Sequence, residues 1–274
     1  MKKNNKIYFS FVIGRLSKKI GSHFQYFPID NWQNEINLSK KFNFTGIEWI
    51  ISDFSNPIFN DEFLKIIKNN LAQKKIVISS ISMDLIMDNP LHTISKLDLY
   101  WLLKKILFLQ KNFKLPRISF PIEERARFNN KKQKITAIKN LKIILSKLSP
   151  KSKICIETDL PIEKLKSLLK IKGLEKLGIL IDIGNIRANG FKIENYFKHF
   201  SNKIYGIHIK YRDKKFGRSK IIKRNFRELE YVKSRVTKLK NLNDITFQTF
   251  RSDNYFIKDL KKNLKNYEAT SFSK

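Results

Sequence analysis

Eight short segments rich in β-branched and aromatic residues recur along the chain, and each is followed by a stretch with helical periodicity. Alternating strands and helices favour parallel strands joined by right-handed crossovers. Eight such units within 274 residues predict an α/β fold, a single (β/α)₈ TIM barrel. The expected strands are 6–13, 46–51, 76–82, 117–121, 153–157, 178–182, 204–209 and 244–248.

The main structural alternative is an open, doubly wound sheet. Such a sheet would be expected to carry a glycine-rich turn after its first strand. The stretch "VIGRLSKK" at that point offers only one glycine, Gly14, which favours the closed barrel. No linker rich in Pro, Gly or Ser interrupts the chain, so residues 1–274 are predicted to form one barrel domain.

The charge of the chain is strongly positive, with 56 Lys and Arg against 24 Asp and Glu and a net charge of +32. A nucleic-acid surface and an anionic small-molecule substrate are the functional interpretations of such a balance. The lysines are spread over nearly every expected helix, together with many Asn and Ile, whereas a nucleic-acid surface needs clustered charge. Compositional drift therefore explains the charge better than nucleic acid, and a phosphorylated substrate remains compatible with it.

Several features bear on where the protein works. No apolar run approaches the ~20 residues of a spanning helix, so no membrane partner is expected. The basic start is followed by an apolar stretch too short for a signal peptide, and it lacks a cleavage site. The single cysteine, Cys155, excludes internal disulfides. A cytoplasmic location is expected, and a homo-oligomer is compatible with the sequence.

Polar residues close several of the expected strands. In barrels of this kind, catalytic groups lie at the carboxyl ends of strands. An aspartate that ends a buried apolar strand, as Asp182 does in "GILID", is costly unless something binds it. The short apolar stretches before these residues are expected to fill the barrel. The strand-end residues are Glu48, Asp84 just past its strand, Glu157, Asp182, His208 and Gln248.

Four of these residues, Glu157, Asp182, His208 and Gln248, end the fifth to eighth strands, which are neighbours around a barrel. One imidazole, two carboxylates and an amide oxygen form a ligand set suited to Mn²⁺, Mg²⁺, Co²⁺ or Zn²⁺. A bound cation would also offset the desolvation cost of both carboxylates. The sequence therefore predicts a divalent metal site at this end of the barrel.

The same residues resemble a known family. The fragments "CIETD", "LIDIGNIRANG", "GIHIKYRD" and "FQTFR" are similar, in order and spacing, to the sugar phosphate isomerase/epimerase superfamily with its xylose isomerase-like barrel. The segments "GIEWI" and "SISMDLIMDNPL" add to the likeness, which covers most of residues 13–253. The resemblance implies a divalent metal held by Glu157, Asp182, His208 and the residue of the eighth strand.

Three departures from the superfamily pattern bear on function. The strand-eight residue is often a glutamate that serves as second acid/base, but an amide such as Gln248 cannot shuttle a proton at neutral pH. Asn185 stands where several relatives carry a substrate-binding histidine. Where relatives usually show Asp-Arg, this chain reads Tyr211, Arg212, Asp213, and the glycine-rich segment expected soon afterwards is "IIKRNF".

The resemblance implies a metal-dependent isomerase or epimerase for a sugar or sugar phosphate. Such a reaction removes a proton next to a carbonyl, and a metal stabilises the resulting enediolate. Glu157 is the candidate base. Glu48 has two interpretations, a ligand for a sugar hydroxyl and a structural salt bridge. The candidate substrate-binding residues are Glu48, Asn185, Lys210, Arg212 and Arg251.

Two other functions compete with this one. A non-catalytic carbohydrate-binding or regulatory barrel is suggested by the altered loop at 216–226 and by Gln248. An apurinic endonuclease would suit the positive charge, but its trinuclear zinc site needs several histidines, and only one of four histidines here ends a strand. Dehydration of a polyol would begin with the same proton abstraction as isomerisation.

Overall fold

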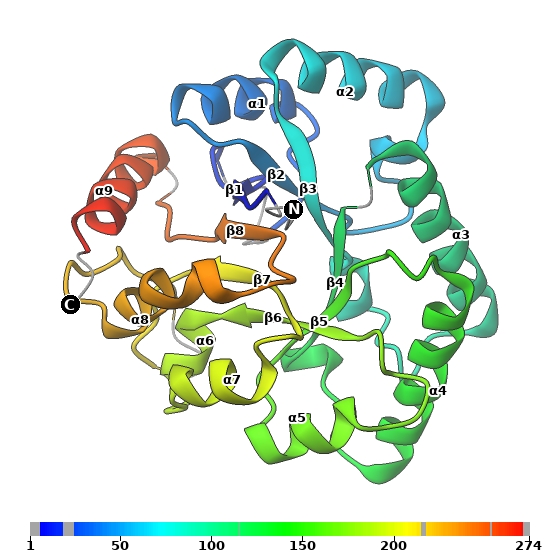
Figure 1. Cartoon of the computed structure of the whole chain (residues 1–274). Coiled ribbons are helices and arrows are strands. Elements are labelled where there is room, and N and C mark those ends of the chain that lie inside the picture. Colours follow the sequence, from blue (N-terminus) through cyan, green and yellow to red (C-terminus); the bar gives the residue numbers. More distant parts are fainter. Residues whose placement is uncertain (1–5, 19–24, 115, 215–217, 253, 271–274) are drawn as a thin grey trace, which may run out of the picture.

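The structure is a computed structural model that describes residues 6–18, 25–114, 116–214, 218–252 and 254–270. Eight parallel strands form a closed barrel in the order in which they occur in the chain (Figure 1). Closure is made by β1 and β8, where Tyr8 pairs with Asp244. The strands are β1 (Tyr8–Val12), β2 (Gly46–Ile50), β3 (Val77–Ser82), β4 (Arg117–Ile122), β5 (Ile154–Thr158), β6 (Gly178–Asp182), β7 (Ile204–Ile209) and β8 (Asp244–Phe247).

The helices form an outer ring around the barrel (Figure 1). Their bounds are α1 (Trp32–Lys41), α2 (Asp61–Lys74), α3 (Lys96–Asn112), α4 (Lys131–Lys147), α5 (Ile162–Leu169), α6 (Ile183–Ala188), α7 (Ile193–Phe200), α8 (Arg227–Arg235) and α9 (Phe256–Ala269). The predicted (β/α)₈ barrel is thus confirmed, and the open sheet is excluded by the β1–β8 pairing. That all of residues 1–274 form one domain stays a prediction.

The apolar strand residues do not fill the barrel, contrary to the expectation from the sequence. Because side chains alternate along a strand, the residues on either side of an inward-facing one point out toward the helices. Trp49 packs against Phe27 and against Trp32 of α1, while its neighbour Glu48 faces the barrel interior. The hydrophobic core therefore lies between the barrel and its ring of helices, and the interior is polar.

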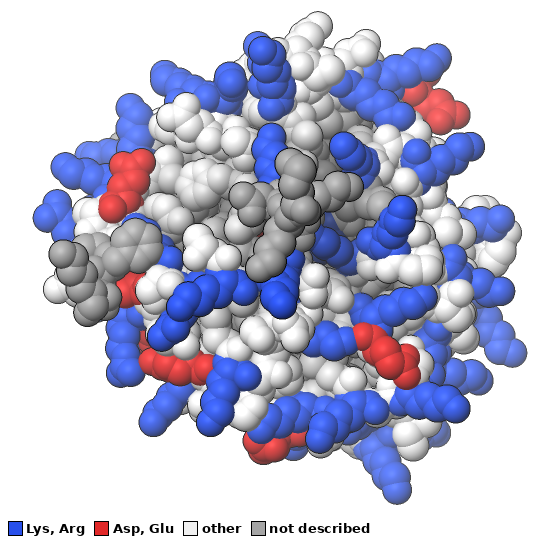
Figure 2. Space-filling view, in the orientation of Figure 1, with Lys and Arg blue, Asp and Glu red and all other residues white. Residues whose placement is uncertain are grey.

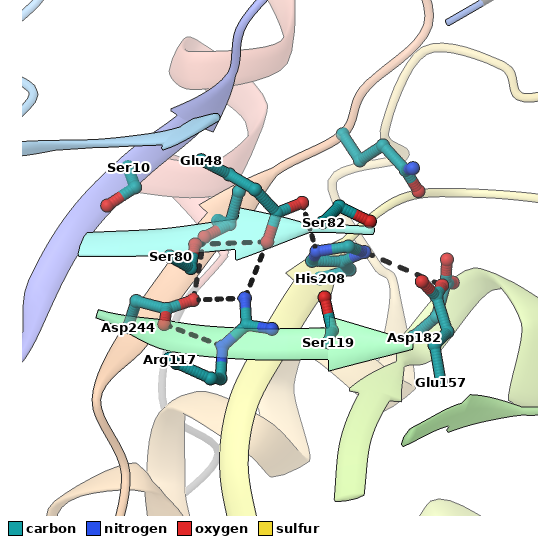
Figure 3. Close-up of polar contacts among 12 residues, drawn as sticks. Ser10, Glu48, Ser80, Ser82, Arg117, Ser119, Glu157, Asp182, His208 and Asp244 are labelled. Carbon is teal, nitrogen blue, oxygen red and sulfur yellow. Dashed lines mark hydrogen bonds and ion pairs between the residues drawn. The ribbon is translucent and has the colours of Figure 1, made fainter. Parts of the chain in front are cut away.

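A buried ion-pair network crosses the barrel interior beneath the strand ends (Figure 3). Arg117 of β4 donates from Nε and Nη2 to both carboxylate oxygens of Asp244 on β8, at 2.8 and 2.9 Å, and from Nη2 to Oε2 of Glu48 on β2 at 2.6 Å. All three side chains are fully buried. Gly206 of β7 makes room for this arginine, because a Cβ there would lie 2.4 Å from Arg117 Nε.

Basic side chains occur all around the visible face of the molecule, with acidic side chains at only a few places among them (Figure 2). This spread agrees with the even distribution of lysine along the sequence. Within the part of the chain that the structure describes, no helix has the length and apolar character needed to cross a membrane.

Candidate metal centre

Three predicted ligands meet at the carboxyl ends of adjacent strands. Glu157 on β5, Asp182 at the end of β6 and His208 on β7 each present a ligand atom, and these atoms lie within 4.8 Å of one another. All three residues are buried, and Asp182 pairs in register with His208. Ligand atoms this close together can share a single cation.

His208 has a carboxylate on each side of its ring (Figure 3). Its Nδ1 lies 3.5 Å from Oε1 of Glu157, and its Nε2 lies 2.9 Å from Oε1 of Glu48. Burial by itself would lower the pKa of His208, but the charges of Glu48 and Glu157 outweigh it and raise this pKa to about 10. The imidazole therefore carries a second proton and a positive charge, unless a bound cation replaces that proton between His208 and Glu157.

Five polar atoms at this point are buried without a well-formed hydrogen bond. They are Glu48 Oε1, Glu157 Oε1, Asp182 Oδ2 and both ring nitrogens of His208. The ring nitrogens are at ion-pair distance from carboxylates, but the directions do not suit N–H···O bonds. Buried polar atoms without hydrogen bonds are costly, and a bound cation would remove that cost for Glu157 Oε1 and His208 Nδ1.

Asp182 is held from two sides. Its Oδ1 accepts the backbone N–H of Asn185 at 2.8 Å, because Asp182 is also the N-cap residue of α6. Its Oδ2 lies 2.5 Å from Nζ of Lys210. Burial acts to raise the pKa of Asp182, but Lys210 and then His208 outweigh it, so this pKa is lowered and the carboxylate is ionised.

The charges of the buried cluster leave room for a divalent cation. Asp244 and Glu48 share the charge of Arg117, Asp182 pairs with Lys210, and the only ion pair of Glu157 among the described residues is with His208. Neutral His208, the form that binds metals, would leave two negative charges uncompensated. A divalent ion balances them, so the residues present fit the metal that the sequence predicts.

The fourth predicted ligand, Gln248, follows β8 and is joined to the cluster through Lys210. Its Oε1 accepts a hydrogen bond from Lys210 Nζ at 2.8 Å, and its Nε2 donates to Oε1 of Gln25 at 2.8 Å. Lys210 therefore lies between Asp182 and Gln248. The amide oxygen of Gln248 is directed at an ammonium group, and its role as a ligand stays a prediction.

Glu48 lies on the floor of the site and is fully buried. Its Oε2 accepts hydrogen bonds from Arg117 and from Ser80 Oγ, and its Oε1 faces His208. Burial would raise the pKa of Glu48, but His208 and Arg117 lower it to about 2. Glu48 is thus in a salt bridge with Arg117, and its role as a ligand for a sugar hydroxyl stays a prediction.

Asn185 and Arg212, two of the predicted substrate-binding residues, do come together. Arg212 Nη1 donates to Oδ1 of Asn185 at 2.6 Å, and Asn185 Nδ2 donates to Oε2 of Glu123 at 3.0 Å. All three line a shallow, solvent-open hollow together with Glu124, Asp159, Ala188 and Asn189. This hollow lies beside Asp182, because Asn185, which lines it, donates its backbone N–H to Asp182.

Arg251, the remaining predicted substrate-binding residue, does not line this hollow. Its Nη1 donates to the backbone oxygen of Ser17, in the loop after β1. Residues 216 and 217 of the altered loop 216–226 lie outside the described residues. The described part of that loop begins beside β7, where Lys220 forms a bridge with Tyr211.

Sequence reasoning missed Glu123, Arg117 and Asp244. Glu123 directly follows β4 and fits the strand-end rule, but the predicted fourth strand ends at Pro121, two residues before it. Arg117 and Asp244 begin their strands, on the side of the barrel away from the expected catalytic end. A charged residue at a strand start carries no signal in the sequence that it points inward.

No protein-family model and no curated protein sequence matches the chain. Solved structures do match. A xylose isomerase domain protein from Alicyclobacillus acidocaldarius has a TM-score of 0.71 at 10% identity, over 97% of this chain and 99% of that one. A xylose isomerase-like TIM barrel protein from Mycobacterium smegmatis, in complex with magnesium, has a TM-score of 0.67 at 14% identity, over 99% and 100%.

Two further matches have printed ligands or activities that bear on the site. The IolI protein with a bound zinc atom has a TM-score of 0.69 at 13% identity, over 97% of this chain and 98% of that one. An L-ribulose 3-epimerase has a TM-score of 0.66 at 12% identity, over 97% and 92%. At these identities the likeness establishes the architecture, and the chain has the fold of the xylose isomerase-like TIM barrels.

Proposed function

We propose that this protein is a divalent-metal-dependent enzyme that isomerises or epimerises a sugar or sugar phosphate by removing a proton next to a carbonyl. The observation that carries the proposal is the cluster of Glu157, Asp182 and His208, whose ligand atoms converge at the carboxyl ends of β5, β6 and β7. Three of the buried atoms without hydrogen bonds, Glu157 Oε1, Asp182 Oδ2 and His208 Nδ1, belong to these residues.

The three residues have different parts in the proposed reaction. A bound divalent ion would polarise the carbonyl and adjacent hydroxyl oxygens of the substrate. Asp182 and His208 are the residues that would hold this ion. Asp182 is positioned by contacts with Asn185 and Lys210. His208 is positioned by its contact with Glu48. Glu157 has no partner that fixes both of its oxygens, so it is the candidate base that takes the proton from carbon.

Gln248 is placed to position a neighbour rather than to carry a proton. Its amide oxygen accepts from Lys210, which in turn pairs with Asp182. Isomerisation through the single base Glu157 therefore suits this site better than epimerisation that uses residue 248 as a second base.

The solved barrels of this fold support the proposal at the level of chemistry. They include one with magnesium, one with zinc and a ketose 3-epimerase. The same fold also occurs in an AP endonuclease from Brucella melitensis, matched with a TM-score of 0.59 at 12% identity. Within the described residues, however, only one group of three His, Cys, Asp or Glu ligands is close enough to share an ion, and a trinuclear site needs more.

The decisive experiment combines metal analysis with proton exchange. Purified protein, His208→Ala and Glu157→Gln would be dialysed against Mn²⁺, and bound metal would be measured. The same proteins would be incubated in deuterated water with free ketoses, aldoses and their phosphate esters, and deuterium at carbon followed by NMR. His199→Ala, a histidine on the exposed face of α7, is the matched control.

We expect His208→Ala to lose metal and Glu157→Gln to keep most of it while losing deuterium incorporation. The His199→Ala variant should behave as the parent protein. Full metal content in His208→Ala would contradict the site. Metal and sugar binding without any carbon-bound exchange in the parent protein would instead favour a non-catalytic carbohydrate-binding barrel.

A further inference from the structure

A glutamate that the proposed function does not use stands next to the proposed base. Glu123 directly follows β4, and β4 pairs with β5 so that Pro121 lies opposite Glu157 and Ile122 opposite Thr158. Both carboxylates therefore leave neighbouring strands at the same end of the barrel. Glu123 also lines the hollow beside the metal cluster.

The side chain of Glu123 is oriented by Asn185, which also contacts Asp182 of the proposed metal site. Asn185 gives its backbone N–H to Asp182, and its Oδ1 accepts from Arg212, so its Nδ2 is the group that remains for Glu123. This bond occupies Oε2 of Glu123. Among the described residues no hydrogen bond to Oε1 is found, and Glu123 is one of the residues that line the hollow.

Glu123 has no ion pair with a Lys or Arg among the described residues. The backbone beside it is strained, because Glu124 has φ +47°, in the left-handed region that favours glycine. Strain of this kind is found where a local geometry is needed for function. A carboxyl group without a counter-ion is also easier to protonate than one in a salt bridge.

We propose that Glu123 is a second catalytic residue, a general acid that gives a proton to a substrate oxygen while Glu157 takes one from carbon. The inference rests on the proposed function. As Glu157 removes the carbon-bound proton, the C–H electron pair forms a C=C bond and the carbonyl π pair moves to oxygen, which takes the proton of Glu123. The reverse steps, on the neighbouring carbon and oxygen, return each carboxyl group to its starting state.

The electrostatics agree with this assignment. Burial, and then the charges of Glu157 and Asp182, raise the pKa of Glu123 to about 8, although Lys210 acts against them. These neighbours favour the protonated form of Glu123, which is the form able to donate a proton. The bond from Asn185 to Oε2 leaves Oε1 as the oxygen that carries the proton.

Glu123→Gln tests the inference with little disturbance, because a glutamine oxygen can still accept from Asn185 while the exchangeable acid proton is lost. The first readout needs no substrate. The infrared spectrum of the Mn²⁺-loaded protein at pH 6, minus that of Glu123→Gln, should show the C=O band of a neutral carboxylic acid. Glu163→Gln, an exposed carboxylate on α5, is the control and should give no such difference band.

The second readout is turnover of the sugars that exchange deuterium in the parent protein. Glu123→Gln should lower kcat by about 100-fold or more with metal content and sugar binding unchanged. Exchange in the parent protein together with near-normal kcat in Glu123→Gln, or the absence of the infrared band, would overturn the inference and leave the proposed function standing. No exchange in the parent protein with any sugar would overturn both.

Discussion

Nε2 of His208 lies 2.9 Å from Oε1 of Glu48, on the side of the imidazole opposite to Glu157. Glu48 is in turn held by Arg117, and Arg117 by Asp244. A carboxylate behind a metal-binding histidine fixes the ring and its tautomer, with the proton on the nitrogen that faces the carboxylate. In the proposed site, Nδ1 would then be the nitrogen that binds the metal next to Glu157 and Asp182.

Glu48→Gln should therefore weaken metal binding without removing a ligand. The glutamine oxygen can keep the bond from Arg117, which places the amide NH₂ toward His208 Nε2 and favours the tautomer with its proton on Nδ1. That tautomer cannot bind the metal, so the Kd for Mn²⁺ should rise about 10- to 100-fold. Isothermal titration with Mn²⁺ measures this change.

The control for this variant is Ser80→Ala, which removes a hydrogen bond to the same carboxylate at 3.0 Å but leaves the charge. Its effect on the Kd should be much smaller. An unchanged Kd in Glu48→Gln would show that the contact between Glu48 and His208 does not set the tautomer.

Arg117 should be among the most important single side chains for stability. It is fully buried, and replacing it by methionine leaves the carboxylates of Glu48 and Asp244 buried without their cation. Breaking a buried ion pair by removing one partner costs about 3–5 kcal/mol. The free energy of unfolding of Arg117→Met, from urea titration, should fall by at least that amount.

Arg125→Met is the matched control for Arg117, because Arg125 also pairs with an aspartate, Asp88, at 3.0 Å. Both side chains of that pair are about two-thirds exposed. An exposed pair contributes about 0–1 kcal/mol, so the two variants should differ by several kcal/mol. Equal losses would mean that the interior network is not what stabilises the barrel.

Metal binding should itself stabilise the fold, because a divalent ion would neutralise the uncompensated negative charge around Glu157 and Asp182. An ion that binds only the folded protein raises the free energy of unfolding by about 2.7 kcal/mol when its concentration is 100 times its Kd. Thermal unfolding with Mn²⁺ and with EDTA measures the difference. His208→Ala should lose most of it, whereas a Mn²⁺-dependent shift of the same size in that variant would place the ion elsewhere.

The sequence was enough to predict the barrel and the residues that meet at its rim. All eight strands were expected within about two residues of their observed bounds, because each is a short β-rich run set off by helical periodicity. Glu157, Asp182 and His208 followed from the strand-end rule. The rule works because parallel strands in a closed barrel present their carboxyl ends together.

The polar interior of the barrel could not be predicted from the sequence. A run such as "GIEWI" is apolar on both sides of Glu48, and the sequence does not say which face of the strand is turned inward. The partners across the barrel, Arg117 with Asp244, are 127 residues apart in the chain. Only closure of the sheet brings them together, so the polar interior and its positioning of His208 required the structure.

Glu35 predicts a specific pH dependence of stability. This residue of α1 is buried, and it accepts a hydrogen bond from the backbone N–H of Gly14 at 2.7 Å and another from Ser17 Oγ. Burial raises its pKa to about 7, against the pull of these bonds and of Arg251. A raised pKa means that the fold favours the protonated form, so the stability it contributes is complete below pH 4.5 and is lost as pH rises through about 7.

Glu35→Gln keeps an oxygen for Gly14 and cannot ionise. Relative to this variant, the parent protein should lose roughly 2–4 kcal/mol of unfolding free energy between pH 4.5 and pH 8, from the 1.36 kcal/mol that corresponds to each unit of pKa shift. Urea titrations at several pH values measure the difference, with the exposed Glu62→Gln as control. Because the comparison is between two proteins at each pH, the titration of all other groups cancels. If the parent protein keeps a constant offset from Glu35→Gln across this range, or becomes less stable relative to it as the pH falls, Glu35 is ionised in the folded protein.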